Sequence, residues 1–276
     1  MLFRSDGKVE LVSTAFAAPE KFSVSDIKPN PAASWANYVK GVVVQLKKRG
    51  VQISGFNAAI HSTLPMGAGM SSSAALEVAT AMTVRRLHPF TLNEIGLGTP
   101  PTANAKGELP HVNTAERMNF AKVCRAAENE FVGVPCGILD QVASLFGNQA
   151  HVMEIDCASL TVGHAPLSGI AMVVCNSMVK HELVGGEYKE LRDNCEAAAR
   201  KLGVKFLRTA EMKQVLAAKS SLTEREFACA HHVVSEIARV VAGERALRAN
   251  DMAQFGQYMF QSHESSRDFQ IGRAHV

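Results

Sequence analysis

The stretch LPMGAGMSSSAALEVATAM, residues 64–82, joins two glycines and three consecutive serines directly to a run of good helix formers. Gly67 and Gly69 permit backbone conformations that other residues resist, and they leave no side chain to keep a ligand off the backbone. A helix that begins at the serines presents unpaired N–H groups and partial positive charge. These features indicate an anion site, typically for phosphate. No Gly-Lys-Ser/Thr string follows, so it is not a Walker A loop. The alternative is a flexible loop with a serine helix cap.

Three carboxylates follow in AENEFVGVPCGILDQVASLFG, residues 127–147. Asp140 is expected in the first turn of a helix, where the helix dipole favours an ionised carboxylate. It is interpreted either as a cap of that helix or as a base or orienting group for a substrate hydroxyl. Glu128 and Glu130 lie near the end of the preceding helix. Either glutamate, with a serine of the loop, would form the hard-oxygen set that suits Mg²⁺, and the alternative for each is a solvated helix face.

Strands and helices are interspersed along the rest of the chain. Alternation of apolar residues predicts strands, and a period of 3.6 residues predicts helices. The expected strands cover residues 7–16, 51–62, 151–156 and 169–177. The expected helices cover residues 35–50, 72–86, 115–131, 186–202, 223–241 and 251–265, with another starting near 139. Residues 88–112 are rich in Pro, Gly, Thr and Asn and are expected to form a surface loop or insertion. Because the parallel βαβ rhythm is broken, the predicted class is α+β.

Composition excludes several classes of protein. The 276 residues are 47% hydrophobic and 20% charged, which is ordinary for a globular chain. A net charge of +3 without clustered basic residues gives no support for nucleic-acid binding. No apolar run approaches the roughly 20 residues that span a bilayer. The six cysteines form no CxxC pair, so we expect free thiols and a cytoplasmic location.

Several motifs resemble one known family of small-molecule kinases. PMGAGMSSSAALE, residues 65–77, resembles the second signature of the GHMP kinases. VPCGILDQVASLFG, residues 134–147, resembles the galactokinase branch of that family. Three further segments resemble the same branch in the same order: WANYVKGV (35–42), VKHELVGGEYKELRDNCE (179–196) and HHVVSEIARV (231–240). The resemblance covers most of residues 7–268 and implies a GHMP kinase fold, with two mixed α/β domains and the active site between them.

The resemblance also implies an activity, which is phosphorylation of the C1 hydroxyl of galactose by ATP with Mg²⁺. It places Asp140 as the catalytic aspartate that faces this hydroxyl. Ser72 and Glu128 would hold Mg²⁺, and Gly137 and Tyr188 match positions that contact the sugar. The residues that would line the triphosphate are Pro65, Gly67, Gly69, Ser71, Ser72 and Ser73. Galactose is the expected partner, with no nucleic acid or membrane, and the chain is expected to be a monomer.

The sequence departs from the family pattern at both ends. The first signature, which supplies an arginine and most of the sugar ligands, is absent, and so is the glycine-rich third motif. We therefore expect an N-terminal ATP-binding domain over residues 1–165 and a partial C-terminal domain over 166–269, truncated at both ends. Residues 270–276 are expected to be a non-native tail. The chain alone is expected to be inactive and poorly folded. The alternatives are another GHMP small-molecule kinase and a non-catalytic sensor of galactose and ATP.

Overall fold

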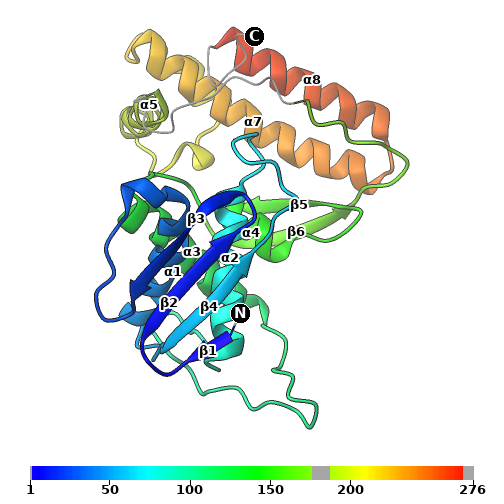
Figure 1. Cartoon of the computed structure of the whole chain (residues 1–276). Coiled ribbons are helices and arrows are strands. Elements are labelled where there is room, and N and C mark those ends of the chain that lie inside the picture. The colour runs from blue at the N-terminus through cyan, green and yellow to red at the C-terminus, as the bar shows by residue number, and fades with distance from the viewer. Residues whose placement is uncertain (1, 176–186, 270–276) are drawn as a thin grey trace. The chain divides into compact units, whose positions relative to one another are not determined.

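The structure is a computed structural model that describes residues 2–175 and 187–269 (Figure 1). Its strands are β1 (Leu2–Arg4), β2 (Lys8–Ser13), β3 (Phe16–Ser23), β4 (Gly55–Ile60), β5 (His151–Asp156) and β6 (Thr161–Pro166). Its α-helices are α1 (Ser34–Lys48), α2 (Ser72–Leu87), α3 (Thr114–Ala126), α4 (Leu139–Phe146), α5 (Glu187–Lys201), α6 (Met212–Ala217), α7 (Glu224–Arg248) and α8 (Met252–Asp268). Two short 3₁₀ helices, η1 (Pro31–Ala33) and η3 (Leu207–Thr209), and a π-helix, η2 (Ala127–Val132), complete the description.

The chain divides into two compact units. The first unit comprises Met1–Gln149 and Ile155–Gly163, and the second contains the helices from α5 onward with Ala150–Glu154 and His164–Ile170. The two-stranded sheet of β5 and β6 contributes residues to both. The boundary at residue 165 expected from the sequence stays a prediction.

The first unit is built on a four-stranded sheet in the order β1-β4-β2-β3. The central strands β2 and β4 are parallel, with Val9 opposite Phe56 and Leu11 opposite Ala58. These four side chains are buried, while their neighbours along each strand alternate to the other side, as a sheet with one covered face requires. At one edge β1 pairs antiparallel with β4, and at the other edge β3 pairs antiparallel with β2.

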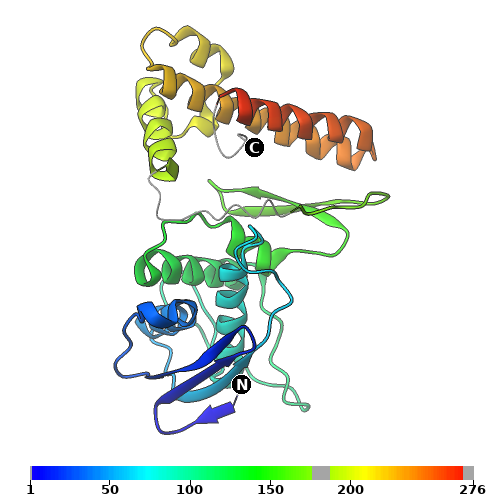
Figure 2. The same cartoon turned by 45° about the horizontal axis from the view of Figure 1, so that its top comes forward.

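Helices α1, α2 and α3 cover the buried face of this sheet (Figure 2). Helix α1 supplies a stripe of Val39, Val42, Val43 and Leu46, each at most 1% exposed. The spacing of three to four residues gives the helix one apolar side, which packs on the sheet. Val78, Ala81 and Val84 of α2 and Phe120 and Val123 of α3 join the same core. This packing fixes the start of α2, where the glycine and serine stretch ends.

The second unit is helical around a smaller core. Ala198 and Ala199 of α5 and Ala230 and Val234 of α7 are buried together. Helices α7 and α8 lie side by side (Figure 1). Two hydrogen bonds show that they run antiparallel: Ser262 Oγ donates to Glu236 Oε2 at 2.6 Å, and Ser265 Oγ bonds His232 Nδ1 at 2.9 Å. Among the described helices, none is long and apolar enough to cross a bilayer.

A capping box begins α7. The Thr223 hydroxyl accepts from the Glu226 amide at 3.2 Å, and Glu226 Oε2 accepts from the Thr223 amide at 2.7 Å. We expect Thr223→Ala to lower the free energy of unfolding by about 1 kcal/mol, since one helix-end donor loses its acceptor. Urea unfolding measures this change. Ser221→Ala is the control because this exposed hydroxyl lies outside the cap, and an equal loss in both variants would contradict the prediction.

The mixed α+β class and every helix expected from the sequence are confirmed, with bounds shifted by a few residues. Two strand predictions were wrong. Residues 7–16 do not form one strand, because the chain turns at Thr14 and returns as β3. Residues 169–175 form no strand in the described chain, and 176–177 lie outside it. This apolar run, in which Met172 and Val173 are 77% and 82% exposed, is not hydrogen-bonded to a neighbouring strand.

Candidate active site

The connection between β4 and α2 has an unusual backbone. Gly67 and Gly69 have φ of +69° and +72°, and Ser71, the N-cap of α2, has φ of +52°. A serine in the left-handed region costs roughly 1–3 kcal/mol and is typical of functional sites. Space around both glycines is open, because a Cβ built on either would meet no atom within 4 Å. A larger side chain would therefore not clash with the surrounding protein. Glycine is favoured here by the positive φ angles and because a ligand can then reach the backbone.

The start of α2 is open to an anion. No side chain caps this helix, and its first backbone bond runs from the Ala75 amide to the Ser71 carbonyl. The amides of residues 72–74 therefore lack a carbonyl partner in the helix and carry the positive end of its dipole. The predicted alternative of a serine N-cap is met in position by Ser71, but the Ser71 side chain makes no capping hydrogen bond. The predicted residues Pro65 to Ser73 lead directly into this free helix N-terminus, and their role as a phosphate site stays a prediction.

Asp140 is the second residue of α4 and is exposed. Ile138 takes the N-cap position and no side chain caps the helix, so Asp140 is not the N-cap residue that the first alternative required. Burial is the main cause of the raised pKa of both Glu77 and Glu128, and the charge of Asp140 adds to it in each case. An exposed carboxylate at a helix start is available to a ligand hydroxyl.

Glu128 is 4% exposed, so the alternative of a solvated face was wrong for this residue. It lies in the π-helix η2, a rare irregularity that is frequent at functional sites. Its Oε2 accepts from Gln141 Nε2 at 2.9 Å and from Cys136 Sγ at 3.4 Å. Burial raises the pKa of Glu128, and the Ser73 hydroxyl beside it acts in the opposite direction. The structure thus brings Glu128 to a serine at the start of α2, and that serine is Ser73.

Glu130, two residues along the same π-helix, behaves differently. It is exposed and accepts from Lys48 Nζ at 2.9 Å and from Gln45 Nε2 at 2.8 Å. These contacts lower its pKa. For Glu130 the expectation of a solvated helix face is confirmed, and only Glu128 faces the predicted site.

Sequence reasoning missed the buried partners of Glu128. Glu77 and Gln141 are both 0% exposed, and Gln141 Nε2 also donates to Glu77 Oε2 at 3.1 Å. One signal was present, because Glu77 follows Ser73 by four residues and therefore shares its helix face. Burial, then the charge of Glu128, raise the pKa of Glu77 to about 9. This carboxyl group is therefore neutral at pH 7.

The raised pKa of Glu77 predicts the direction of a pH dependence. The folded chain holds a proton that the unfolded chain releases near pH 4.5, so stability falls as pH rises from there to about 9. Between pH 7 and pH 8 this group alone should remove up to about 1.4 kcal/mol. Glu77→Gln should flatten the slope, because glutamine is neutral throughout. Urea unfolding at several pH values measures it, and an unchanged slope in the variant would refute the assignment.

The two predicted sugar-contacting residues lie in different units. Gly137 is exposed, three residues before Asp140 in the same unit. Tyr188 lies in the first turn of α5 in the second unit, and its side chain is outside what the structure describes. The structure therefore brings the loop, Glu128, Asp140 and Gly137 into one unit, and it does not place Tyr188 relative to them.

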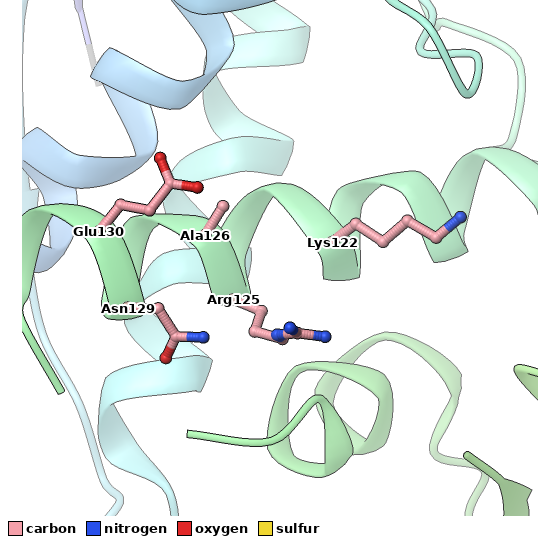
Figure 3. A pocket seen from close by; sticks show the side chains of 5 residues that line it. All are labelled: Lys122, Arg125, Ala126, Asn129 and Glu130. Carbon is pink, nitrogen blue, oxygen red and sulfur yellow. The ribbon is translucent and has the colours of Figure 1, made fainter. Parts of the chain in front are cut away.

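A pocket of about 230 Å³ lies elsewhere on the first unit (Figure 3). It is lined from α3 and η2 by Lys122, Arg125, Ala126, Asn129 and Glu130. Of the candidate residues in the first unit, Glu130 lines it, whereas Glu128, Gly137, Asp140 and the glycine and serine loop do not. The amide of Asn129 is engaged with the backbone of Cys136 at 2.7 and 3.3 Å. This pocket therefore does not include the residues that the resemblance assigns to the active site.

Comparison with known proteins shows what the chain is similar to. Residues 37–98 match the N-terminal domain of GHMP kinases. The human galactokinase is 38% identical over 274 residues, which cover 96% of this chain and 64% of that protein. The galactokinase of Roseiflexus sp. (strain RS-1) is 38% identical over 271 residues, covering 96% of this chain and 63% of that protein. The chain thus spans less than two thirds of these relatives.

Solved structures agree with the sequence relatives. The Lactococcus lactis galactokinase, crystallised with galactose, superposes with a TM-score of 0.78 at 25% identity, covering 97% of this chain and 66% of that one. The Methanococcus jannaschii mevalonate kinase has a TM-score of 0.51 at 15% identity, a likeness of fold alone. The chain is therefore similar in sequence to galactokinases, and its fold is the GHMP kinase fold expected from its motifs.

Proposed function

We propose that this chain carries the phosphate-binding and catalytic part of an enzyme that transfers a phosphoryl group from ATP to the C1 hydroxyl of galactose. One observation supports this most. An uncapped helix start after two glycines of positive φ lies in the same unit as the buried Glu128, whose pKa is affected by Ser73 of that helix, and the exposed Asp140. The relatives are galactokinases, and one was crystallised with galactose.

The residues have the following proposed roles. Backbone amides between Pro65 and Ser73, including those of Gly67, Gly69, Ser71 and Ser72, cradle the triphosphate of ATP. Asp140 orients the sugar hydroxyl and accepts its proton while the oxygen attacks the γ-phosphorus and the bond to the leaving ADP oxygen breaks. Gly137 and Tyr188 contact the sugar.

Mg²⁺ fits the donor set of the site. Ser72 and Glu128 offer a hydroxyl and a carboxylate, and Mg²⁺ is usually held by one or two carboxylates together with substrate phosphates and water. No cluster of three or more His, Cys, Asp or Glu that could hold a metal occurs among residues 2–175 and 187–269, which is consistent with a metal that arrives with its nucleotide. When bound, the ion neutralises charge on the phosphates. We propose that Ser72 and Glu128 would hold it, with Ser73 fixing Glu128.

Location and assembly belong to the same proposal. The six cysteines are free thiols, which supports a cytoplasmic location. A monomeric state and the lack of nucleic-acid or membrane partners stay predictions from the sequence.

The test separates binding from turnover. Calorimetry with the chain is expected to show ATP binding that Mg²⁺ strengthens. Turnover is measured in a chimera that joins residues 1–269 to the parts of the Lactococcus lactis galactokinase outside its alignment with this chain, and galactose-dependent ADP release is expected. If the chain showed no Mg²⁺-dependent binding of ATP, the proposal would be overturned. ADP release with another small alcohol but not with galactose would favour a different GHMP kinase. Binding of both ATP and galactose without ADP release would favour a sensor.

A further inference from the structure

Gln141 is buried between two carboxyl groups that come from different elements. Gln141 belongs to α4, Glu77 to α2 and Glu128 to η2, and they are 0%, 0% and 4% exposed. A buried amide in such a place must be hydrogen-bonded or it destabilises the fold. The three side chains therefore form one cluster that ties the helix of the phosphate loop to the proposed magnesium ligand.

Both hydrogens of the Gln141 amide nitrogen are used. This nitrogen carries two N–H groups, and it lies 3.1 Å from Glu77 Oε2 and 2.9 Å from Glu128 Oε2. Rotation of the amide would break both bonds at once. The distance between the two carboxyl groups is thereby set by a single planar group.

The Glu77 end of this bridge is a fixed point. Glu77 lies in the second turn of α2, which is held in the core by Val78 and Ala81, the first and fourth residues after Glu77. Within the described chain, Glu77 Oε1 and Gln141 Oε1 are buried and lack a hydrogen-bond partner.

The Glu128 end is the one whose orientation matters. Its Oε2 is shared by Gln141 and the Cys136 thiol, and Ser73 at the start of α2 is near enough to affect the pKa of this carboxylate. Glutamate has three side-chain torsions to fix, and these contacts fix them with the carboxylate next to the serines. Groups that hold a metal ligand in this way commonly change metal affinity by 10–100-fold when removed.

We propose that Gln141 is a positioning residue: its amide, anchored on Glu77, holds the Glu128 carboxylate toward the serines that begin α2, so that Mg²⁺ with ATP finds this ligand already in place. The inference rests on the proposed function and adds a residue that contacts neither nucleotide nor metal. A purely structural role for Gln141 predicts a loss of stability alone.

Gln45 offers a matched control. It is also buried, at 3% exposure, and its amide nitrogen also donates to a carboxylate of η2. That carboxylate belongs to Glu130, which is exposed and lies outside the cluster. Gln45→Leu therefore removes the same type of bond from the same π-helix without touching Glu128.

The test measures ATP affinity by calorimetry with Mg²⁺ and with EDTA, using the whole chain. We expect Gln141→Leu to reduce the gain in affinity that Mg²⁺ gives by about 10–100-fold, and to leave metal-free affinity unchanged. Gln45→Leu should keep the full gain, and so should Glu77→Gln, which retains a neutral anchor. Thermal unfolding identifies variants that do not fold. If Gln141→Leu does not fold, Gln141→Asn takes its place. The shorter asparagine side chain cannot span both carboxyl groups, so this variant should lose the same Mg²⁺-dependent gain in ATP affinity.

The outcomes are distinct. An equal Mg²⁺ gain in Gln141→Leu and Gln45→Leu would overturn the positioning role while leaving the proposed function intact. A wild-type chain that binds ATP without any Mg²⁺ dependence, or does not bind it, would overturn the proposed function and this inference together.

Discussion

Asp140→Asn is expected to lower galactose-dependent turnover in the chimera by about 10²–10⁴-fold while ATP affinity stays within a few-fold of wild type. The amide keeps the size of the side chain and its place in the first turn of α4, but it cannot accept the proton of the attacking hydroxyl. Asp140 is exposed and is not the N-cap of its helix, so its loss should not destabilise the fold. ADP release measures turnover, and calorimetry measures ATP binding.

Glu224→Gln is the matched control for this experiment. Glu224 is likewise an exposed carboxylate in the first turn of a helix, α7, where it interacts favourably with the helix dipole. Removing it takes away the same kind of charge without touching the proposed site. Equal turnover in Asp140→Asn and wild type would show that Asp140 is not the base. A loss of ATP binding in Asp140→Asn alone would assign it to the nucleotide instead.

The phosphate loop could be predicted from sequence because its requirements are local. Positive φ favours glycine and an anion site needs a free helix start, and residues 67–73 carry the sequence signals of both. The cluster around Glu128 could not be predicted in the same way. Glutamate and glutamine on helices normally face water, and only the packing of α2, η2 and α4 buries Glu77 and Gln141 together.

The fold shows the same division between local and distant causes. Helix α1 was predicted well because its apolar stripe repeats within the helix. Strand β3 was missed because it contains Pro19 and because Glu20 is buried by an ion pair with Lys40 of α1. Its edge position in the sheet is what tolerates the proline. The run 169–175 has strand-like residues, and no local signal tells whether a partner strand exists to pair with it.

The second large effect is expected at the phosphate loop. Gly69→Val should weaken Mg²⁺-dependent ATP binding by about 10²-fold or more. At φ of +72° a valine is strained by roughly 1–2 kcal/mol, and a shift that relieves it moves backbone amides away from the phosphates. Each charge-assisted bond lost adds about 1.5–3 kcal/mol. Calorimetry measures the affinity.

Gly107→Val separates backbone strain from lost ligand contacts. Gly107 has φ of +74°, and a Cβ there also meets no atom within 4 Å, so the two valines are strained alike and crowd nothing. Gly107 lies in the 88–112 stretch, outside the proposed site. Both variants should therefore lose similar thermal stability, and only Gly69→Val should lose ATP. If Gly107→Val weakened ATP binding equally, strain alone would explain the effect. Gly69 would then be needed for the conformation of the loop, and would not be needed to let the phosphate reach the backbone.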